Sequence, residues 1–166
     1  MNSENGKIND MKQKVVLLLW AVCLMSCNTE VWQMSGEYSY KTSGRVEIEN
    51  ADTTIQKNLP DEIGVLHILS TDRKSEEVVL TMNQLGGSVV TTHGMVEGNR
   101  IELENFERTL KLQTTLQEKN FVLQVGGYGE RYENTIVFTL EYDGESEDGE
   151  YTLSGEDIRM VATWNY

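Results

Sequence analysis

From Gly36 to the end of the chain, apolar or aromatic side chains alternate with polar ones in short runs. The pattern is clearest over residues 136–142, which read IVFTLEY. A period of two places successive side chains on opposite faces of a strand, so that one face can be buried while the other meets water. Short breaks rich in Gly, Asn, Asp and Ser separate the runs, and no helix of 10–15 residues is expected between them. The pattern predicts an all-β antiparallel domain over residues 35–166, either a barrel or a β-sandwich.

The individual runs predict ten short strands. They cover residues 36–42, 45–49, 65–71, 78–83, 88–96, 100–104, 106–118, 121–125, 136–142 and 158–166. The run over 106–118 suits helical as well as strand spacing, and we assign it as a strand because its threonines are β-branched. Residues 50–63 are the least regular internal segment, with room for one short helical turn. The glycines at 126, 127 and 129 predict a turn or a close approach of the backbone rather than a phosphate-binding loop, since a strand and not a helix follows them.

Residues 11–27, MKQKVVLLLWAVCLMSC, have the organisation of a secretory signal. Two lysines precede an apolar run over residues 15–25, and a small residue follows it. A short basic head, an apolar core of about 7–15 residues and a small-residue cleavage site are typical of a signal peptide. The run is too short for a membrane-spanning helix, which needs about 20 apolar residues. Translation can begin at Met1 or at Met11, because residues 2–10 are polar.

The order Leu24-Met25-Ser26-Cys27 resembles the lipobox of bacterial lipoproteins. The resemblance implies cleavage before Cys27 and acylation of its thiol. It implies a lipoprotein signal peptide over residues 1–26 and a lipidated tether over residues 27–34. The protein would then be held by its lipid at the outer membrane of the cell envelope, with the periplasmic or surface side left open.

The charge balance restricts the partners of the chain. It carries 27 acidic against 14 basic residues, a net charge of −13. Such a surface repels phosphate backbones, and nucleic acid is therefore excluded as a partner. The two cysteines are Cys23, which would leave with the signal, and Cys27, which would be acylated. No disulfide is then available, and packing alone must hold the domain together.

The first strand begins Ser35-Gly36-Glu37-Tyr38, and the last strand carries Arg159 and Trp164. This layout resembles the calycins, which include lipocalins, fatty-acid-binding proteins and avidins, and in particular the calycin-like lipoproteins of Bacteroides-type bacteria. In that superfamily a glycine–x–aromatic motif starts the first strand, and a basic residue of the last strand packs over the aromatic ring. The resemblance implies an up-and-down barrel of about eight strands. It also implies that Gly36 and Tyr38 form the motif, with Arg159 as the basic partner.

Several aromatic side chains share the apolar faces of the first and last long strands. They are Tyr38, Tyr40, Phe138, Tyr142, Trp164 and Tyr166. An eight-stranded barrel is just wide enough to fill itself or to hold one small ligand, so these residues either form plain core or line a pocket. A buried tyrosine hydroxyl needs a partner, and several inward tyrosines favour a partly polar cavity.

No pattern in the chain predicts catalysis or a cofactor. The only histidines, His67 and His93, belong to no metal-binding motif, and His67 alternates with apolar residues as an interior or rim side chain would. The acidic run 141–150 offers Asp143, Glu145 and Glu147 to Ca²⁺. It lacks the glycine and the last glutamate that an EF-hand requires, so we interpret it as a solvated connection between strands.

Two functions follow from these observations, and a third has less support. The first is a non-enzymatic, lipid-anchored module that binds a small apolar or amphipathic ligand in its barrel. The alternative is a filled barrel that acts as an inhibitor or accessory subunit of an envelope assembly, with its acidic rim against a basic partner. An envelope hydrolase would require one of the two histidines beside a nucleophile in a cleft.

Overall fold

The computed structural model describes residues 29–165 apart from residues 73–74 and 86. The predicted signal peptide, Cys27 and Tyr166 lie outside the described residues. One helix, α2 (Thr29–Met34), precedes the strands. The strands are β1 (Gly36–Ser43), β2 (Arg45–Glu49), β3 (Thr54–Asn58), β4 (Glu62–Ser70), β5 (Glu77–Gln84), β6 (Val89–Glu97), β7 (Arg100–Leu103), β8 (Phe106–Gln113), β9 (Glu118–Tyr132), β10 (Thr135–Ser146) and β11 (Thr152–Trp164).

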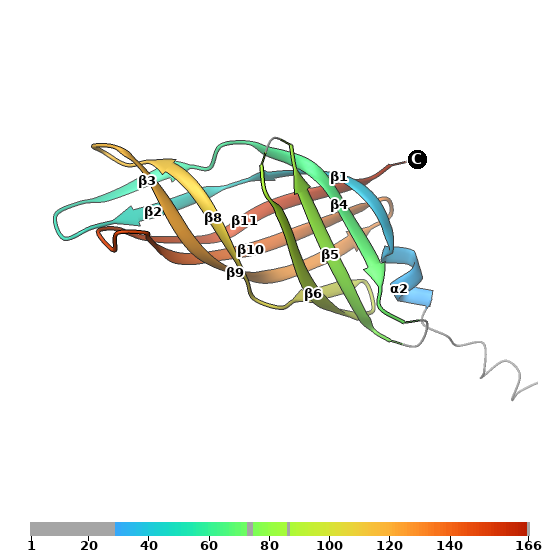
Figure 1. The fold of residues 1–166 in the computed structure, drawn as a ribbon. Coiled ribbons are helices and arrows are strands. Elements are labelled where there is room, and N and C mark those ends of the chain that lie inside the picture. Colours follow the sequence, from blue (N-terminus) through green and yellow to red (C-terminus); the bar gives the residue numbers. More distant parts are fainter. Residues whose placement is uncertain (1–28, 73–74, 86, 166) are drawn as a thin grey trace, which may run out of the picture.

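Eight of these strands close into a barrel (Figure 1). The order is β1-β4-β5-β6-β7-β9-β10-β11, and β11 pairs in turn with β1. Every pairing is antiparallel. The predicted antiparallel barrel of about eight strands is therefore confirmed, and the alternative sandwich is not the fold.

The three remaining strands, β2, β3 and β8, lengthen the barrel at the end opposite α2. Only Gly44 separates β1 from β2, and both pair with β11. In the same way β3 leads into β4, and β7 leads into β8, which continues the pairing along β9. The chain thus runs up and down in eight passes, and β5 and β6, with 8 and 9 residues, are the shortest of them. Within the described residues, β3 and β8 each have one strand partner, and both lie at the end opposite α2 (Figure 1).

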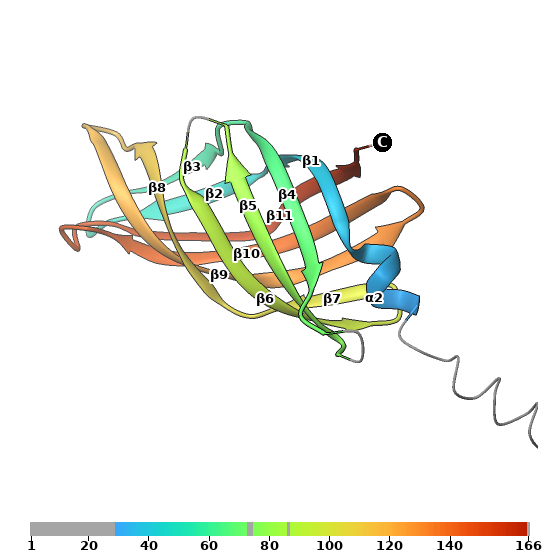
Figure 2. The same cartoon turned by 45° about the vertical axis from the view of Figure 1, so that its right-hand side comes forward.

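The segment 29–34 is helical, which corrects the expectation of a tether over residues 27–34. Val31 and Met34 are buried in the core, and the Ser35 amide and hydroxyl both donate to the Val31 carbonyl. The Tyr38 hydroxyl donates to the Met34 carbonyl at 2.8 Å. Figure 2 shows α2 lying across one end of the barrel. Val31 and Met34 are three positions apart, as buried residues of a helix often are. One such pair is too little for the sequence to distinguish a short helix from a linker.

One further expectation is wrong, and a second is wrong in part. Residues 54–58 form strand β3 rather than a helical turn, because they pair with β2. The glycines at 126, 127 and 129 lie inside β9 and do not end it. A Cβ on Gly129 would come within 2.6 Å of the Phe138 ring, so at this glycine the expected close approach, and not the turn, is what the structure shows.

Candidate functional site

The barrel interior is filled by its own side chains. Large apolar residues from all sides of the barrel are fully buried, among them Phe121, Phe138, Leu66, Ile101 and Leu123. Of the aromatic residues predicted either to form core or to line a pocket, Tyr38, Tyr40, Phe138 and Tyr142 are buried in this core, and Trp164 packs against it. They lie inside the barrel and form part of its packed core.

Two of these tyrosines converge on a charged pair that the sequence analysis did not single out. Arg108 of β8 donates from Nη2 to Glu62 Oε2 of β4 at 2.7 Å and from Nη1 to the Tyr142 hydroxyl at 3.2 Å. The Tyr40 hydroxyl donates to Glu62 Oε1 at 3.4 Å. The side chains of Arg108 and Glu62 are only 8% and 11% exposed. We refer to these four residues as the interior cluster.

The electrostatics of the interior cluster keep Arg108 charged and the tyrosines neutral. Burial lowers the pKa of Arg108, but Tyr142 and Glu62 outweigh that effect and the net shift is upward. Burial, followed by the charge of Glu62, raises the pKa of Tyr40. Burial also raises the pKa of Tyr142, and Arg108 partly offsets it. Mutual pairing is thus what makes these polar groups tolerable inside the barrel.

One polar atom of the interior cluster lacks a hydrogen-bond partner among the described residues. It is the Nε atom of Arg108, which is buried. A cavity of about 10 Å³, lined by Arg108, Tyr40 and residues of β5, lies beside the cluster. Such a volume is close to the lower limit for one water molecule. Arg108 could have been found from the sequence, because it occupies an inward position between Phe106 and Leu110 in the alternation.

The ends of β1 and β11 meet as the resemblance to calycins implies, but with a different partner. The Tyr38 and Trp164 rings pack edge to face with centroids 5.1 Å apart. A Cβ on Gly36, where φ is +153°, would come within 2.6 Å of the Trp164 ring. The structure does not bring Arg159 to Tyr38. Arg159 is exposed and lies opposite Ser43 in the pairing, five positions along β1 from Tyr38.

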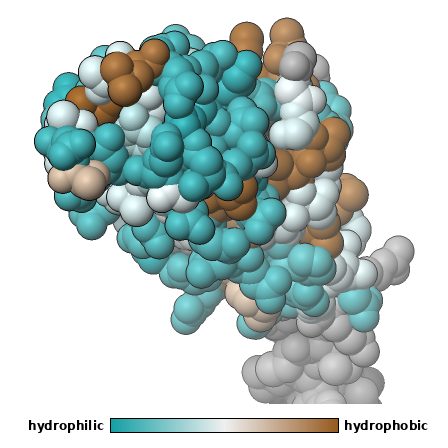
Figure 3. All heavy atoms as spheres, turned by 60° about the vertical axis from the view of Figure 1, so that its left-hand side comes forward, coloured by the Kyte–Doolittle hydropathy of each residue, from teal (hydrophilic) through white to brown (hydrophobic). Residues whose placement is uncertain are grey.

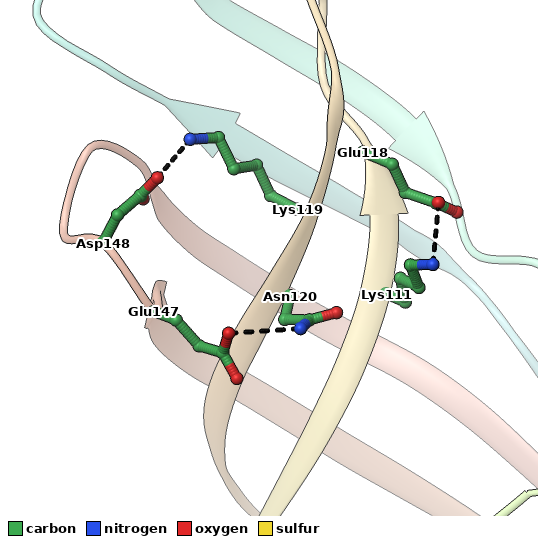
Figure 4. Close-up of a pocket in the computed structure, with 6 residues that line it drawn as sticks. All are labelled: Lys111, Glu118, Lys119, Asn120, Glu147 and Asp148. Carbon is green, nitrogen blue, oxygen red and sulfur yellow. Dashed lines mark hydrogen bonds and ion pairs between the residues drawn. The ribbon is translucent and has the colours of Figure 1, made fainter.

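A polar groove of about 410 Å³ lies at the end of the barrel opposite α2 (Figure 4). The ammonium of Lys119 binds Asp148 and, at 2.7 Å, Glu150 in the β10–β11 turn. Lys111 pairs with Glu118 at 2.9 Å, and Asn120 donates to Glu147 at 3.1 Å. Because these charges are already paired within the chain, the groove holds the hairpin in place and offers little to an anion.

The residues considered for metal binding do not converge. His67 and His93 lie on the outer face, where their Nδ1 atoms are 3.8 Å from Glu37 and 2.9 Å from Glu77. Asp143 and Glu145 belong to β10, and Glu147 follows it. Across residues 29–165 outside the gaps, no group of three or more metal-binding side chains forms a metal site. Within the same residues, no helix has the length and apolar character that crossing a membrane requires.

Exposed apolar residues gather on the outer face of β4, β5 and β6. Leu85 and Val89 are 73% and 64% exposed, and Ile63, Leu69 and Met95 are at least half exposed. The half-buried Val65 and Val79 lie between them. We call these seven residues the apolar face. Figure 3 shows hydrophobic residues along its right-hand side and smaller groups at the upper left and near the centre, in a view that is otherwise mostly hydrophilic.

The apolar face is also poor in charge. Its intervening outward positions hold Thr81, Asn83, Thr91 and the two histidines, and none of these is a carboxylate, lysine or arginine. Carboxylates border it at Glu37, Glu77 and Glu97. Glu77 lies opposite Met95 and pairs with His93, so carboxylates reach one end of the apolar face. In a chain of net charge −13, a face with so few carboxylates is still a distinct surface. It is the best candidate for an interface that the described residues offer.

Comparison with known proteins gives no family for this chain. No family model matches it, and no curated protein matches it. Among solved structures it is similar to a redesigned β-barrel at 11% sequence identity and a TM-score of 0.36, over 85% of this chain and 98% of that chain. The barrel topology therefore rests on the strand pairing of this chain itself.

Proposed function

We propose that this protein is a lipid-anchored interaction module of a bacterial envelope, in which a filled barrel presents the apolar face to another protein. The barrel serves as a rigid support, and the partner protein binds to its outer surface. No covalent chemistry is part of this function. The observation that carries the proposal is the contrast between a packed interior and an outer face on which exposed apolar residues gather and charged residues are few.

The packed interior supports this function over capture of a ligand inside the barrel. Small-molecule sites usually have volumes of about 300–1,000 Å³. The cavity beside the interior cluster measures about 10 Å³. A lipid-sized molecule would have to displace fully buried residues such as Phe138 and Phe121, at a cost of several kcal/mol for each large side chain removed from the core.

The composition of the apolar face indicates the chemistry of the partner. Contiguous exposed apolar surface on a soluble domain marks a site of protein association. The partner would offer an apolar patch for Ile63, Leu85 and Val89, because these side chains have no polar group to pair. Basic residues at its rim would complement the bordering carboxylates and speed association.

The signal at the N-terminus supports the anchored location. The lipobox-like order ends at Cys27, and acylation of this residue would put a lipid two residues before α2 begins. With a lipid on Cys27, the barrel would be confined to the membrane surface, where its partner would be an envelope protein. Confinement raises the effective concentration of a membrane-bound partner, so a modest interface suffices.

A pulldown from cell envelopes tests the interface. Val89→Glu places a carboxylate in the apolar face, and Leu116→Glu places one at an 83% exposed site in the β8–β9 turn, outside that face. The proposal expects a protein that co-purifies with the wild type and with Leu116→Glu and is lost with Val89→Glu. Equal recovery with the two variants, or no protein recovered with the wild type, would refute the proposed interface.

A further inference from the structure

We infer that the α2 end of the barrel rests on the membrane surface, with Trp32 and Tyr132 in the headgroup layer. The inference rests on the proposed lipid at Cys27. It adds an orientation to that location: the barrel meets the bilayer with its α2 end and keeps the apolar face to the side, free for a protein partner.

First, only a short length of chain would separate the lipid from the barrel. Cys27 precedes Thr29 by two residues, which span at most about 7 Å. The headgroup layer on each side of a bilayer is itself about 5–8 Å thick. A barrel held this closely has no room to turn away from the surface as long as α2 stays folded against it.

The second argument is that α2 is fixed to the barrel at several points. Val31 and Met34 are buried in the core, and the Met34 carbonyl accepts from Tyr38. On the polar side, Glu30 accepts from the Gly98 amide in the β6–β7 turn, and Arg131 of β9 donates to Gln33 at 2.7 Å. Unwinding α2 into a longer tether would expose two core side chains and break these bonds. The short distance from Cys27 is therefore maintained.

The third argument is the kind of side chain exposed at this end. Trp32 is 58% exposed on α2, and Tyr132 is 55% exposed at the end of β9, next to the residue that binds Gln33. Tryptophan and tyrosine prefer the interface between lipid and water, because their rings are apolar and carry one polar group. Two exposed aromatics from separate elements, both tied to the anchored end, are what a surface resting on lipid requires.

The charges at this end are mixed. Glu30, Glu97 and Glu133 lie here, as do Arg100 after the β6–β7 turn and Arg131, which donates to Gln33. A zwitterionic surface such as phosphatidylcholine therefore tests the contact of the aromatic rings with lipid without an added attraction between charges.

Tryptophan quenching tests the orientation. The full chain is expressed in a bacterium that lipidates proteins, and its intact mass is measured first. It is then reconstituted into zwitterionic phosphatidylcholine vesicles with bromine near the headgroup end of the acyl chains. After removal of the signal, Trp32 and Trp164 are the remaining tryptophans. Subtracting the signal of Trp32→Phe from that of the wild type isolates Trp32 without altering the packed Trp164.

The inference expects Trp32 emission to shift to the blue and to be quenched by bromine. A matched control places the only tryptophan at Leu116→Trp in a Trp32→Phe/Trp164→Phe background, and its emission should be unaffected. A lipidated protein with unquenched Trp32, or with equal quenching at Leu116→Trp, would overturn the orientation alone. A protein without the mass of a lipid would overturn the anchoring, and the orientation with it.

Discussion

The Nη2 atom of Arg108 lies 2.7 Å from Oε2 of Glu62 inside the barrel, where both side chains are almost completely buried. The two residues are 46 positions apart and join β8 to β4, which do not pair as strands. The contact therefore crosses the barrel at the end where β5 and β6 are too short to pair with the extended strands. Removing the Arg108–Glu62 contact should therefore destabilise this end of the barrel.

Breaking this pair on one side should be costly. Glu62→Leu leaves a buried guanidinium unpaired, and Arg108→Met leaves a buried carboxylate, so each should lower the free energy of unfolding by about 3 kcal/mol or more. The double variant Glu62→Leu/Arg108→Met should lose much less than the sum, because no buried charge remains. Urea unfolding of the four proteins measures the coupling. Additive losses would show that the two side chains do not depend on each other.

The Tyr38 hydroxyl should contribute to stability and to its dependence on alkaline pH. Tyr38→Phe loses the bond to the Met34 carbonyl and should cost about 1 kcal/mol at neutral pH. Burial raises the pKa of Tyr38 to about 12, although Arg131 opposes the shift. Since the folded protein holds this proton more tightly than the unfolded chain, stability should fall as the pH rises from 10 through 12.

The Tyr38→Phe protein should show a shallower decline over that interval. A residual slope is expected, because the pKa values of Tyr40 and Tyr142 are also raised. Thermal unfolding followed by circular dichroism between pH 8 and pH 12 measures both slopes. Identical slopes in the two proteins would show that Tyr38 ionises in the folded state as readily as in the unfolded chain.

The contact between Asp148 and Lys119 should contribute to stability in acid. Hydrogen bonds from Lys119 and Ser146 lower the pKa of Asp148 from 3.8 to about 2. The contribution is present above the pKa of the unfolded chain and is lost as the pH falls through about 2. Asp148→Asn should therefore flatten the decrease in melting temperature between these values. Asp143→Asn, on the outer face of the adjoining β10, serves as the charge-matched control. Equal flattening by both would attribute the effect to net charge.

Gly36 should not tolerate a side chain. A Cβ at this position meets the Trp164 ring, so Gly36→Ala should push the ring away from Tyr38 and lower stability by about 1–3 kcal/mol. The near-ultraviolet circular dichroism of Trp164 should change with it. Ser43→Ala, at the exposed other end of β1, should leave both quantities unchanged. An unaltered tryptophan signal in Gly36→Ala would mean that the rings do not pack as described.

The sequence predicted the barrel because alternation along a strand is a local property. The alternation of Phe138, Leu140 and Tyr142 with polar residues predicts within a few positions which face of the strand is buried. All three side chains are buried in the structure. The continuity of β9 through its glycines was not predictable, because Gly129 is explained by the Phe138 ring of another strand. Helix α2 was missed because six residues carry too little periodicity to identify a helix.

The interior cluster was partly predictable. The alternation predicts that Tyr40 and Tyr142 face the interior, and both are buried there. Their hydroxyls predict a partly polar cavity, and the structure gives them polar partners beside a cavity of only about 10 Å³. Their partners come from β4 and β8, and no local pattern tells which distant charged residue will meet them. The apolar face was also hidden in the sequence, because it takes the register of the β4–β5 pairing to bring Leu69 beside Val79 and Leu85 beside Ile63.

The most direct test of the central claim, that the barrel is filled and acts through its outer surface, is native mass spectrometry of the full-length protein released gently from cell envelopes. We predict the mass of the lipidated polypeptide, with any additional mass belonging to a protein subunit that is lost in Val89→Glu. A small molecule that binds one to one to the wild-type polypeptide, and that is lost in Arg108→Met, would contradict the claim.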